Sequence, residues 1–264
     1  MKTNPDIQEE TNRRAFARGS VINCYRELKE LFFVEEVILE SLRRSIRDKR
    51  LLDIGVGGGR TTKHLLEISK KYTGIDYTSA FVRVVRATYP QATLVQADAR
   101  DLRMFGDSEF DFALFSYNGI DYISHNGRLQ ALREIHRVLR PGGFFMFSTH
   151  NLNYKYLRKG PWRGGSLLNS SHRRDSLLAV LNWPRHLIMK RYELDLGEYA
   201  IVNDSAHGYS LLTYYIGIEQ QLKQLKSRGF DKTRVFDLNG NEVNHSVDFS
   251  WIYYLTTKTS GLDF

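Results

Sequence analysis

A glycine-rich turn at residues 55–59 constrains the fold of this chain more than any other feature. Residues 51–60 read LLDIGVGGGR, so an apolar run leads directly into a turn with four glycines, and a helical pattern of apolar residues follows. Glycine has no Cβ atom, and a ligand can therefore approach the backbone of such a turn closely. The order of strand, glycine turn and helix is typical of an α/β domain whose ligand lies against the turn.

Two aspartates follow the turn at informative distances. Asp76 lies 21 positions after Gly55, at the end of an apolar segment. A Rossmann-like domain places a carboxylate there to accept the ribose hydroxyls of a bound nucleoside. Asp98 follows the next apolar segment. Either aspartate could instead cap a helix, because aspartate is favoured at helix N-termini. The combination of the turn with both carboxylates favours a nucleoside-binding site.

Strand-like and helix-like segments alternate along most of the chain. We expect strands at 50–54, 72–75, 92–96, 110–116, 144–149, 199–202, 209–216, 233–238 and 249–256, and helices at 21–45, 61–70, 79–89, 128–139, 177–181 and 218–228. Strands that alternate with helices of this length form a parallel sheet with helices on both faces. The last two strands, joined by a turn at 239–241, are close enough to pair antiparallel. The sequence therefore predicts an α/β fold.

Five short motifs give the chain a family resemblance. They are the D-x-G-x-G-x-G motif at 53–59, GID at 74–76, QADA at 96–99, FDFA at 110–113 and VLRPGG at 138–143. In this order, over residues 48–150, the chain resembles the class I S-adenosylmethionine-dependent methyltransferases, in particular the group that methylates small molecules. The resemblance implies a Rossmann-like three-layer sandwich with a mostly parallel seven-stranded sheet whose last strand is antiparallel.

The resemblance also implies S-adenosyl-L-methionine as the cofactor and S-adenosyl-L-homocysteine as the product. Asp76 would bind the ribose hydroxyls, and Asp98 and Ala99 would bind adenine. Asp53 precedes the turn, where bracing the loop competes with ligand contact as its role. The predicted cofactor-binding residues are Asp53, Gly55, Gly57, Gly59, Asp76, Tyr77, Asp98, Ala99, Phe115, Ser116 and, from the N-terminal helix, Tyr25.

A nicotinamide-binding Rossmann enzyme is the main competing interpretation. Its fingerprint is G-x-G-x-x-G, in which the third glycine lets helix and strand pack closely. Residues 55–60 read GVGGGR, so Arg60 stands where that glycine belongs. An acidic residue placed for adenine also suits S-adenosylmethionine better, and we therefore favour the methyltransferase.

Several residues could act on the methyl acceptor. A hydroxyl acceptor usually needs a general base, whereas an amine needs only to lose its proton. Strand ends in a parallel sheet face the ligand, so the candidate bases are His150 and Asp121, with His207 from the predicted hairpin; Tyr117 and Asn118 could position the acceptor. We find no pattern of metal ligands and expect no metal. The choice between O- and N-methylation stays open.

The overall composition indicates a globular protein. The chain has 264 residues, of which 42% are hydrophobic. The single cysteine, Cys24, excludes an intrachain disulfide, so a reducing compartment is expected. No run of 18 apolar residues and no signal-peptide pattern is present, so we expect a cytoplasmic protein. The oligomeric state cannot be derived from the sequence.

The basic excess is concentrated in one segment. Residues 151–192 contain nine Lys or Arg and one Asp, which accounts for the whole net charge of +8. We predict an N-terminal helical cap at 1–47, a methyltransferase domain at 48–150 and 210–264, and a basic insertion or substrate lid at 151–209. Arg173 and Arg174 would bind an anionic small-molecule acceptor, because guanidinium groups bind anions bidentately.

Other interpretations of the basic segment remain. It could bind RNA, as in an RNA methyltransferase, although no separate RNA-binding module is apparent and nucleic acid is disfavoured. It could make peripheral contact with an anionic membrane, or it could be a solvated insertion. The whole protein could also bind the cofactor without catalysing a reaction.

Overall fold

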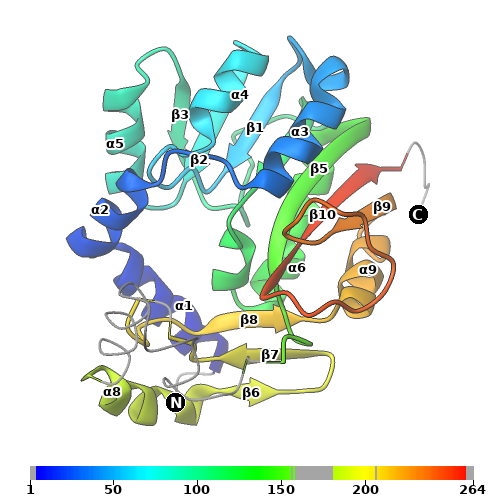
Figure 1. The fold of residues 1–264 in the computed structure, drawn as a ribbon. Coiled ribbons are helices and arrows are strands. Elements are labelled where there is room, and N and C mark those ends of the chain that lie inside the picture. Colours follow the sequence, from blue (N-terminus) through cyan, green and yellow to red (C-terminus); the bar gives the residue numbers. More distant parts are fainter. Residues whose placement is uncertain (1–3, 156, 158–180, 206, 260–264) are drawn as a thin grey trace.

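A twisted β-sheet runs through the centre of the protein (Figure 1). The computed structural model describes residues 4–155, 157, 181–205 and 207–259. Seven strands form the main sheet in the order β3 (Thr93–Gln96), β2 (Tyr72–Asp76), β1 (Leu51–Ile54), β4 (Phe110–Phe115), β5 (Leu139–Asn151), β10 (Trp251–Lys258) and β9 (Phe230–Phe236). The first five are parallel, and β10 runs antiparallel to both of its neighbours. The predicted mostly parallel sheet with an antiparallel last strand is confirmed.

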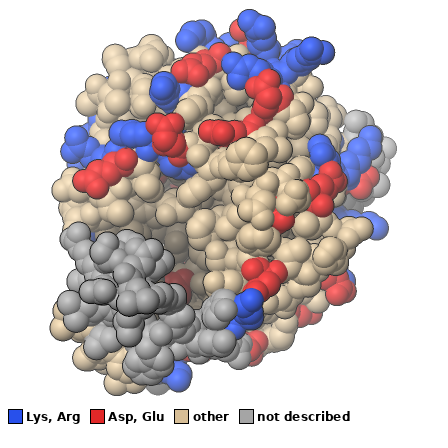
Figure 2. All heavy atoms as spheres, in the orientation of Figure 1, with Lys and Arg blue, Asp and Glu red and all other residues tan. Residues whose placement is uncertain are grey.

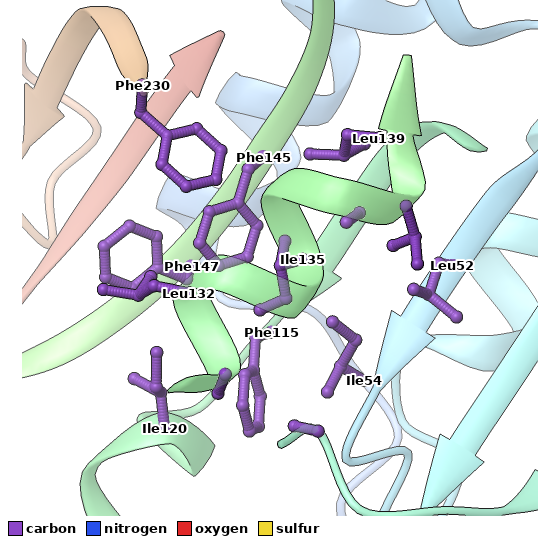
Figure 3. Close-up of a cluster of buried hydrophobic side chains, with 14 of the residues drawn as sticks. Leu52, Ile54, Phe115, Ile120, Leu132, Ile135, Leu139, Phe145, Phe147 and Phe230 are labelled. Atoms are coloured by element: carbon purple, nitrogen blue, oxygen red, sulfur yellow. The ribbon is translucent and has the colours of Figure 1, made fainter. Parts of the chain in front are cut away.

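Helices cover both faces of this sheet. One layer contains α3 (Phe33–Ile46), α4 (Thr62–Ile68) and α5 (Ser79–Thr88), and the other contains α6 (His125–Val138) and α9 (Ile218–Lys226). Successive strand residues point to opposite faces, so Leu51 packs with the first layer and Leu52 with the second. Figure 3 shows the hydrophobic cluster between the sheet and the second layer, in which Ile135 of α6 lies near Phe145 of β5. This is the predicted three-layer sandwich.

A small antiparallel extension continues the sheet at the carboxyl end of β5. Strand β8 (Thr213–Ile216) pairs in parallel with His150 and Asn151, β7 (Tyr199–Val202) pairs antiparallel with β8, and β6 (Leu194–Asp195) pairs antiparallel with β7. The predicted hairpin is thereby confirmed, although β8 begins later than expected. The hairpin crosses the boundary predicted between residues 209 and 210, and the division into domains stays a prediction.

The N-terminal region differs from the prediction. The single helix expected at 21–45 is wrong, because α2 (Gly19–Glu27) and α3 are separate helices. The Glu35 carboxylate accepts a hydrogen bond from the backbone N–H of Phe32 at 2.8 Å. This contact caps the N-terminus of α3, so a new helix begins there. A further helix, α1 (Asn4–Phe16), was not expected. Its Gln8 and Asn12 side chains are buried and donate to the carbonyl of Leu212, so α1 is held by polar contacts that a hydrophobic pattern does not reveal.

Three other segments differ from the prediction. Strand β5 begins directly after α6, so residues 141–143 lie inside it. No helix is predicted at 183–189, yet α8 (Trp183–Met189) begins there with Pro184 in its first turn, where proline is tolerated. Residues 237–250 connect β9 to β10, a longer connection than the predicted turn. The helix predicted at 177–181 lies outside the described residues except for Leu181. No helix in the described ranges is long and apolar enough to cross a membrane.

Candidate functional site

A cavity that is partly open to solvent lies at the carboxyl ends of β1, β2, β3 and β4; its empty space, with the solvent at its mouth included, is about 1100 Å³. Helices α1 and α2 supply its other walls. Figure 2 shows one face of the protein, on which charged side chains stand mainly towards the margins and uncharged residues form most of the middle. The predicted site residues that line the cavity are Tyr25, Gly55, Gly57, Asp76, Tyr77, Asp98, Ala99, Phe115, Ser116 and Tyr117.

The glycine turn requires its glycines for two reasons. Gly55, Gly57 and Gly59 have φ angles of 70°, 51° and 85°, in the left-handed region that side chains with a Cβ avoid. At Gly58 the reason is space, since a Cβ there would lie 2.2 Å from the carbonyl oxygen of Tyr25. The backbone of α2 therefore packs directly on the turn. Gly59 is directed towards α5 and is not among the residues that line the cavity.

Asp76 both braces the turn and faces the cavity. Its Oδ2 atom accepts a hydrogen bond from the backbone N–H of Gly57 at 3.0 Å, and Oδ1 accepts from that of Thr78 at 2.7 Å. Burial raises the pKa of Asp76 to about 6. The two proposed roles, local capping and ligand contact, are compatible, because each carboxylate oxygen retains a lone pair.

Asp98 is held by a neighbouring arginine. It accepts hydrogen bonds from Arg100 Nε at 2.9 Å and Nη2 at 2.7 Å, and Arg100 Nη1 also donates to Glu9 of α1 at 2.5 Å. Burial by itself would raise the pKa of Asp98, but the hydrogen bonds and charge of Arg100 outweigh it, and this pKa is lowered. Asp98 is therefore an anion whose oxygens already face a donor.

Asp53 lies beneath the turn and does not line the cavity. Its side chain is buried, and Oδ2 accepts hydrogen bonds from Thr61 Oγ1 at 2.7 Å and Tyr72 OH at 2.9 Å. Burial raises the pKa of Asp53 to about 6. This geometry is that of a brace between β1, β2 and the start of α4.

Sequence reasoning missed a buried ion pair beside the cavity. Arg60, which stands where a dinucleotide fingerprint has glycine, donates to Glu35 Oε1 at 2.8 Å and to Ser116 Oγ at 2.6 Å. Tyr253 OH donates to the same Glu35 oxygen at 3.0 Å. The network joins α3, the glycine turn, β4 and β10. One signal was available, because Glu35 occupies an apolar position of its helix, three residues before Ile38.

Two strained residues follow β4. Tyr117 and Asn118 have φ angles of 51° and 57°, which are uncommon for residues other than glycine. The Asn118 backbone N–H donates to Ser148 Oγ at 2.8 Å, which fixes this conformation. Tyr117 lines the cavity, whereas Asn118 is buried behind it. Strained backbone of this kind is concentrated at functional sites.

The structure brings His150 and Asp121 together. Asp121 Oδ2 accepts hydrogen bonds from His150 Nδ1 at 2.8 Å and from the His150 backbone N–H at 2.6 Å. Its Oδ1 atom accepts from Thr149 Oγ1 at 2.6 Å and is ion-paired with Arg128. The Asp121 and Arg128 side chains are both fully buried. This carboxylate is therefore held in one orientation by donors from β5 and α6.

The Asp121 contact determines which His150 nitrogen is available for chemistry. A carboxylate facing Nδ1 places the proton of a neutral imidazole there and leaves the lone pair on Nε2. Asn118 Nδ2 lies 3.4 Å from Nε2, which is long for a hydrogen bond. The His150 side chain is 12% exposed. It does not line the cavity itself, but Tyr122, whose ring centroid is 6.3 Å from that of His150, does.

The remaining candidates are placed elsewhere. His207, in the connection between β7 and β8, stacks on Tyr25 with 5.7 Å between ring centroids, and burial lowers its pKa. It is not beside His150. Arg173 and Arg174 lie outside the described residues. Within the part of the chain that the structure describes, no three His, Cys, Asp or Glu side chains are grouped to hold a metal ion.

Comparison with known proteins identifies the domain. Residues 52–147 match a family model described as a methyltransferase domain. A probable S-adenosylmethionine-dependent methyltransferase of Mycolicibacterium smegmatis is 29% identical over 116 residues, which cover 44% of each chain. A fatty-acid O-methyltransferase of the same organism is 34% identical over 41% of this chain and 40% of its own. The chain thus spans about half the length of the curated relatives it matches.

Solved structures share the fold. A 1,6-didemethyltoxoflavin-N1-methyltransferase of Burkholderia thailandensis, solved with S-adenosylhomocysteine bound, has a TM-score of 0.57 at 14% identity and covers 97% of this chain and 88% of its own. A glycopeptide N-methyltransferase, MtfA, also complexed with S-adenosylhomocysteine, has a TM-score of 0.55 at 16% identity over 85% and 89%. The family model, the motifs and this fold together make residues 52–147 a domain of the class I S-adenosylmethionine-dependent methyltransferase type.

Proposed function

We propose that this chain transfers a methyl group from S-adenosylmethionine to a hydroxyl group of a small-molecule acceptor. The observation that carries the proposal is the hydrogen bond between His150 Nδ1 and the buried Asp121. A histidine oriented in this way has a lone pair that can accept a proton. A hydroxyl acceptor must lose its proton during methyl transfer, whereas an unprotonated amine can react without a base. Curated relatives include O-methyltransferases for fatty acids and for ubiquinone biosynthesis.

The cavity fits the cofactor. Its glycine turn leaves room that a Cβ would occupy at Gly55, 3.0 Å from the Phe115 ring, and the carboxylates of Asp76 and Asp98 line the same cavity. Gly55 and Gly57 would contact the methionine part, Asp76 the ribose, and Asp98 with Ala99 the adenine. When bound, the cofactor supplies an electrophilic methyl group on a sulfonium centre.

The protein's own residues would align the acceptor and take its proton. His150 Nε2 would accept the hydroxyl proton, and Asp121 would stabilise the imidazolium that forms. Arg128 and Thr149 would keep the Asp121 carboxylate in place. Tyr117 would stand between the acceptor and the cofactor cavity. His207, stacked on Tyr25, would close the cofactor end and take no proton.

The anionic character of the acceptor remains a proposal. It rests on the charge of residues 151–192, with Arg173 and Arg174 as its proposed ligands. Binding of RNA, contact with a membrane and a non-catalytic role are the alternatives that a test must separate.

The test is transfer of labelled methyl from S-adenosylmethionine into a cell extract that is then separated into small-molecule, RNA, protein and lipid fractions. We expect label in the small-molecule fraction. Label in RNA alone would overturn the acceptor class, and tight cofactor binding without transfer into any fraction would favour a non-catalytic role.

A variant tests the cofactor end separately. Asp76→Asn removes the carboxylate that would accept the ribose hydroxyls, so the Kd for S-adenosylhomocysteine should rise by about 10- to 100-fold, since a hydrogen bond to a charged group contributes about 1.5–3 kcal/mol. Asp48→Asn, on the exposed turn after α3, is the matched control and should leave this Kd unchanged. Calorimetric titration measures both. Equal affinities for the two variants would contradict the assignment of Asp76.

A further inference from the structure

Exposed hydrophobic side chains are concentrated in and around α8. Of the seven large hydrophobic side chains that are exposed among the described residues, four lie between positions 181 and 196. Leu181, Leu187 and Ile188 are 66%, 60% and 58% exposed. Figure 1 shows α8 at the periphery of the molecule, at the end away from α3 and α4. Single exposed hydrophobic residues are ordinary, whereas a group of them marks an interaction surface.

Helix α8 has one docked face and one exposed apolar face. On the docked face, Met189 packs against the cluster that contains Ile201 and Tyr214, and His186 Nδ1 lies 3.0 Å from Asn203 Oδ1. Leu187 and Ile188 take part in none of the hydrophobic clusters formed by the described residues. The helix is therefore anchored on one side and presents aliphatic side chains to solvent on the other.

Basic side chains accompany the exposed leucine and isoleucine. Arg185 of α8 and Lys190 and Arg191 of η3 (Lys190–Tyr192) are all exposed, and residues 176–192 contain no acid. None of the three lines the cofactor cavity, and none forms an ion pair with a described residue. Arg185 Nη1 donates only to the Gly208 carbonyl, at 3.2 Å. Their charge is thus available to a partner outside the cavity.

The acids that follow in the sequence are engaged by the backbone. Glu193 Oε1 accepts the Asn203 N–H at 3.0 Å, and Asp195 Oδ1 accepts the Gly197 N–H at 3.0 Å. Leu196, the fourth exposed residue, stands next to Asp195 and is left out of the surface for that reason. We define the α8 surface by its three aliphatic and three basic residues, Leu181, Arg185, Leu187, Ile188, Lys190 and Arg191.

This combination matches an anionic lipid surface better than RNA. At a membrane surface, aliphatic side chains enter the boundary between headgroups and acyl chains, while Lys and Arg stay beside lipid phosphates. Proteins that hold single-stranded RNA stack bases on aromatic rings. The aromatic residue of α8, Trp183, instead packs against His186 and Tyr209, with ring centroids 4.6 Å and 5.9 Å away.

We propose that the α8 surface binds the surface of an anionic membrane, with Leu187 and Ile188 among the lipid chains and the three basic side chains against lipid phosphates. The inference does not depend on which acceptor is methylated, because no residue of the α8 surface lines the cavity. Binding would be peripheral and reversible, since few apolar side chains contribute and salt screens the charges.

Co-sedimentation of the purified chain with vesicles tests the lipid. One set of vesicles contains phosphatidylcholine alone, and the other contains phosphatidylcholine mixed with phosphatidylglycerol. Because each basic residue near an anionic surface strengthens binding by about 5-fold, we expect binding to the mixed vesicles to be about 10- to 100-fold tighter and to weaken with salt. Equal binding to both sets overturns the inference. Binding to neither set also overturns it, and a labelled oligouridylate that binds instead would assign the surface to RNA.

A double variant tests the aliphatic part of the surface. Leu187→Ser combined with Ile188→Ser should weaken binding to the mixed vesicles by about 10- to 100-fold. Met104→Ser is the matched control, because Met104 is 51% exposed and lies between β3 and β4. Unchanged affinity for S-adenosylhomocysteine would show that both variants are folded. Equal vesicle binding by both variants contradicts the proposal, and so does a wild-type dimer that the double variant turns into a monomer.

A second double variant separates local charge from net charge. Lys190→Gln combined with Arg191→Gln should weaken binding to the mixed vesicles by about 10- to 30-fold. Arg43→Gln combined with Arg44→Gln, at exposed positions of α3, removes the same charge and should leave binding nearly unchanged. An equal loss in the two variants would show that net charge, and not the α8 surface, attracts the membrane.

Discussion

The two ends of the proposed site, a cofactor end at Asp98 and an acceptor end at Asp121, contain ion pairs that differ in exposure. At the cofactor end, Asp98 and Arg100 pair in partial contact with solvent, with side chains 30% and 22% exposed. At the acceptor end, Asp121 and Arg128 are both fully buried. An accessible pair contributes little net stability and can exchange partners cheaply, whereas a buried pair is costly to disturb.

Because of this difference, we expect the Asp98 carboxylate to reorient more easily than the Asp121 carboxylate. We expect Arg100 to release Asp98 when a ligand offers its own donor, because this pair is partly exposed. Asp121 has four donors, from Arg128, Thr149 and two nitrogens of His150, and cannot turn without losing several of them. The acceptor end is therefore preorganised, which is what electrostatic catalysis requires.

The largest expected effect is on turnover and should be confined to the acceptor end. His150→Gln removes the proposed base, so kcat should fall by about 10²- to 10⁴-fold, while the Kd for S-adenosylhomocysteine stays unchanged. His245→Gln, at an exposed position between β9 and β10, is the control and should retain full activity. Steady-state kinetics with the identified acceptor decide the matter. An unaltered kcat in His150→Gln would remove His150 from the mechanism.

A second variant tests how strongly the acceptor end is held. Arg128→Met leaves the buried Asp121 charge without its counter-ion, so the free energy of unfolding should fall by about 3–5 kcal/mol. Arg103→Met breaks the exposed pair with Asp101 and should change it by less than about 1 kcal/mol. Urea denaturation of both variants measures the contrast. A similar small loss in each would mean that the acceptor end is not rigidly held.

The pH dependence of stability tests the brace beneath the cofactor end. Burial raises the pKa of Asp53 to about 6 from its ordinary 3.8, so the folded protein binds this proton more tightly than the unfolded chain does. The contribution of Asp53 to the free energy of unfolding should therefore decrease as pH rises from about 4 to above 6, by about 3 kcal/mol.

Comparison with Asp53→Asn isolates this contribution, because every other group titrates in both proteins. The stability of the wild type relative to Asp53→Asn, measured by urea denaturation from pH 4 to 7.5, should decline across that window. A relative stability that rises with pH would mean that the carboxylate is stabilised in its ionised form.

The smallest expected effect concerns the contact between the glycine turn and α2. Gly58→Ala would place a methyl group 2.2 Å from the Tyr25 carbonyl oxygen, so α2 must shift, at a cost of about 1–3 kcal/mol in the free energy of unfolding. Gly19→Ala, where the added methyl meets open space, should be neutral or stabilising by up to about 1 kcal/mol. If both variants unfold alike in urea, the packing of α2 on the turn is not required.

Prediction from sequence succeeded where contacts are short in sequence and failed where they are long. The glycine turn and Asp76, which share a hydrogen bond across 19 positions, belong to one strand–helix–strand unit with a recognisable pattern. The contact between Glu35 and Tyr253 spans 218 positions, and no local pattern indicates it. Helix α1 was missed for a similar reason, because Gln8 and Asn12 bury polar side chains against a carbonyl about 200 residues away.

The sequence by itself determined the layered α/β architecture and the position of the predicted cofactor end, because hydrophobic periodicity and glycine conformation act over a few residues. Among three candidate catalytic residues, only the tertiary structure decided that His150 and Asp121 form a pair while His207 stacks on Tyr25. The physical reason is that a hydrogen bond depends on where β5 and the segment after β4 are placed side by side in the sheet. That placement follows from packing of the whole core.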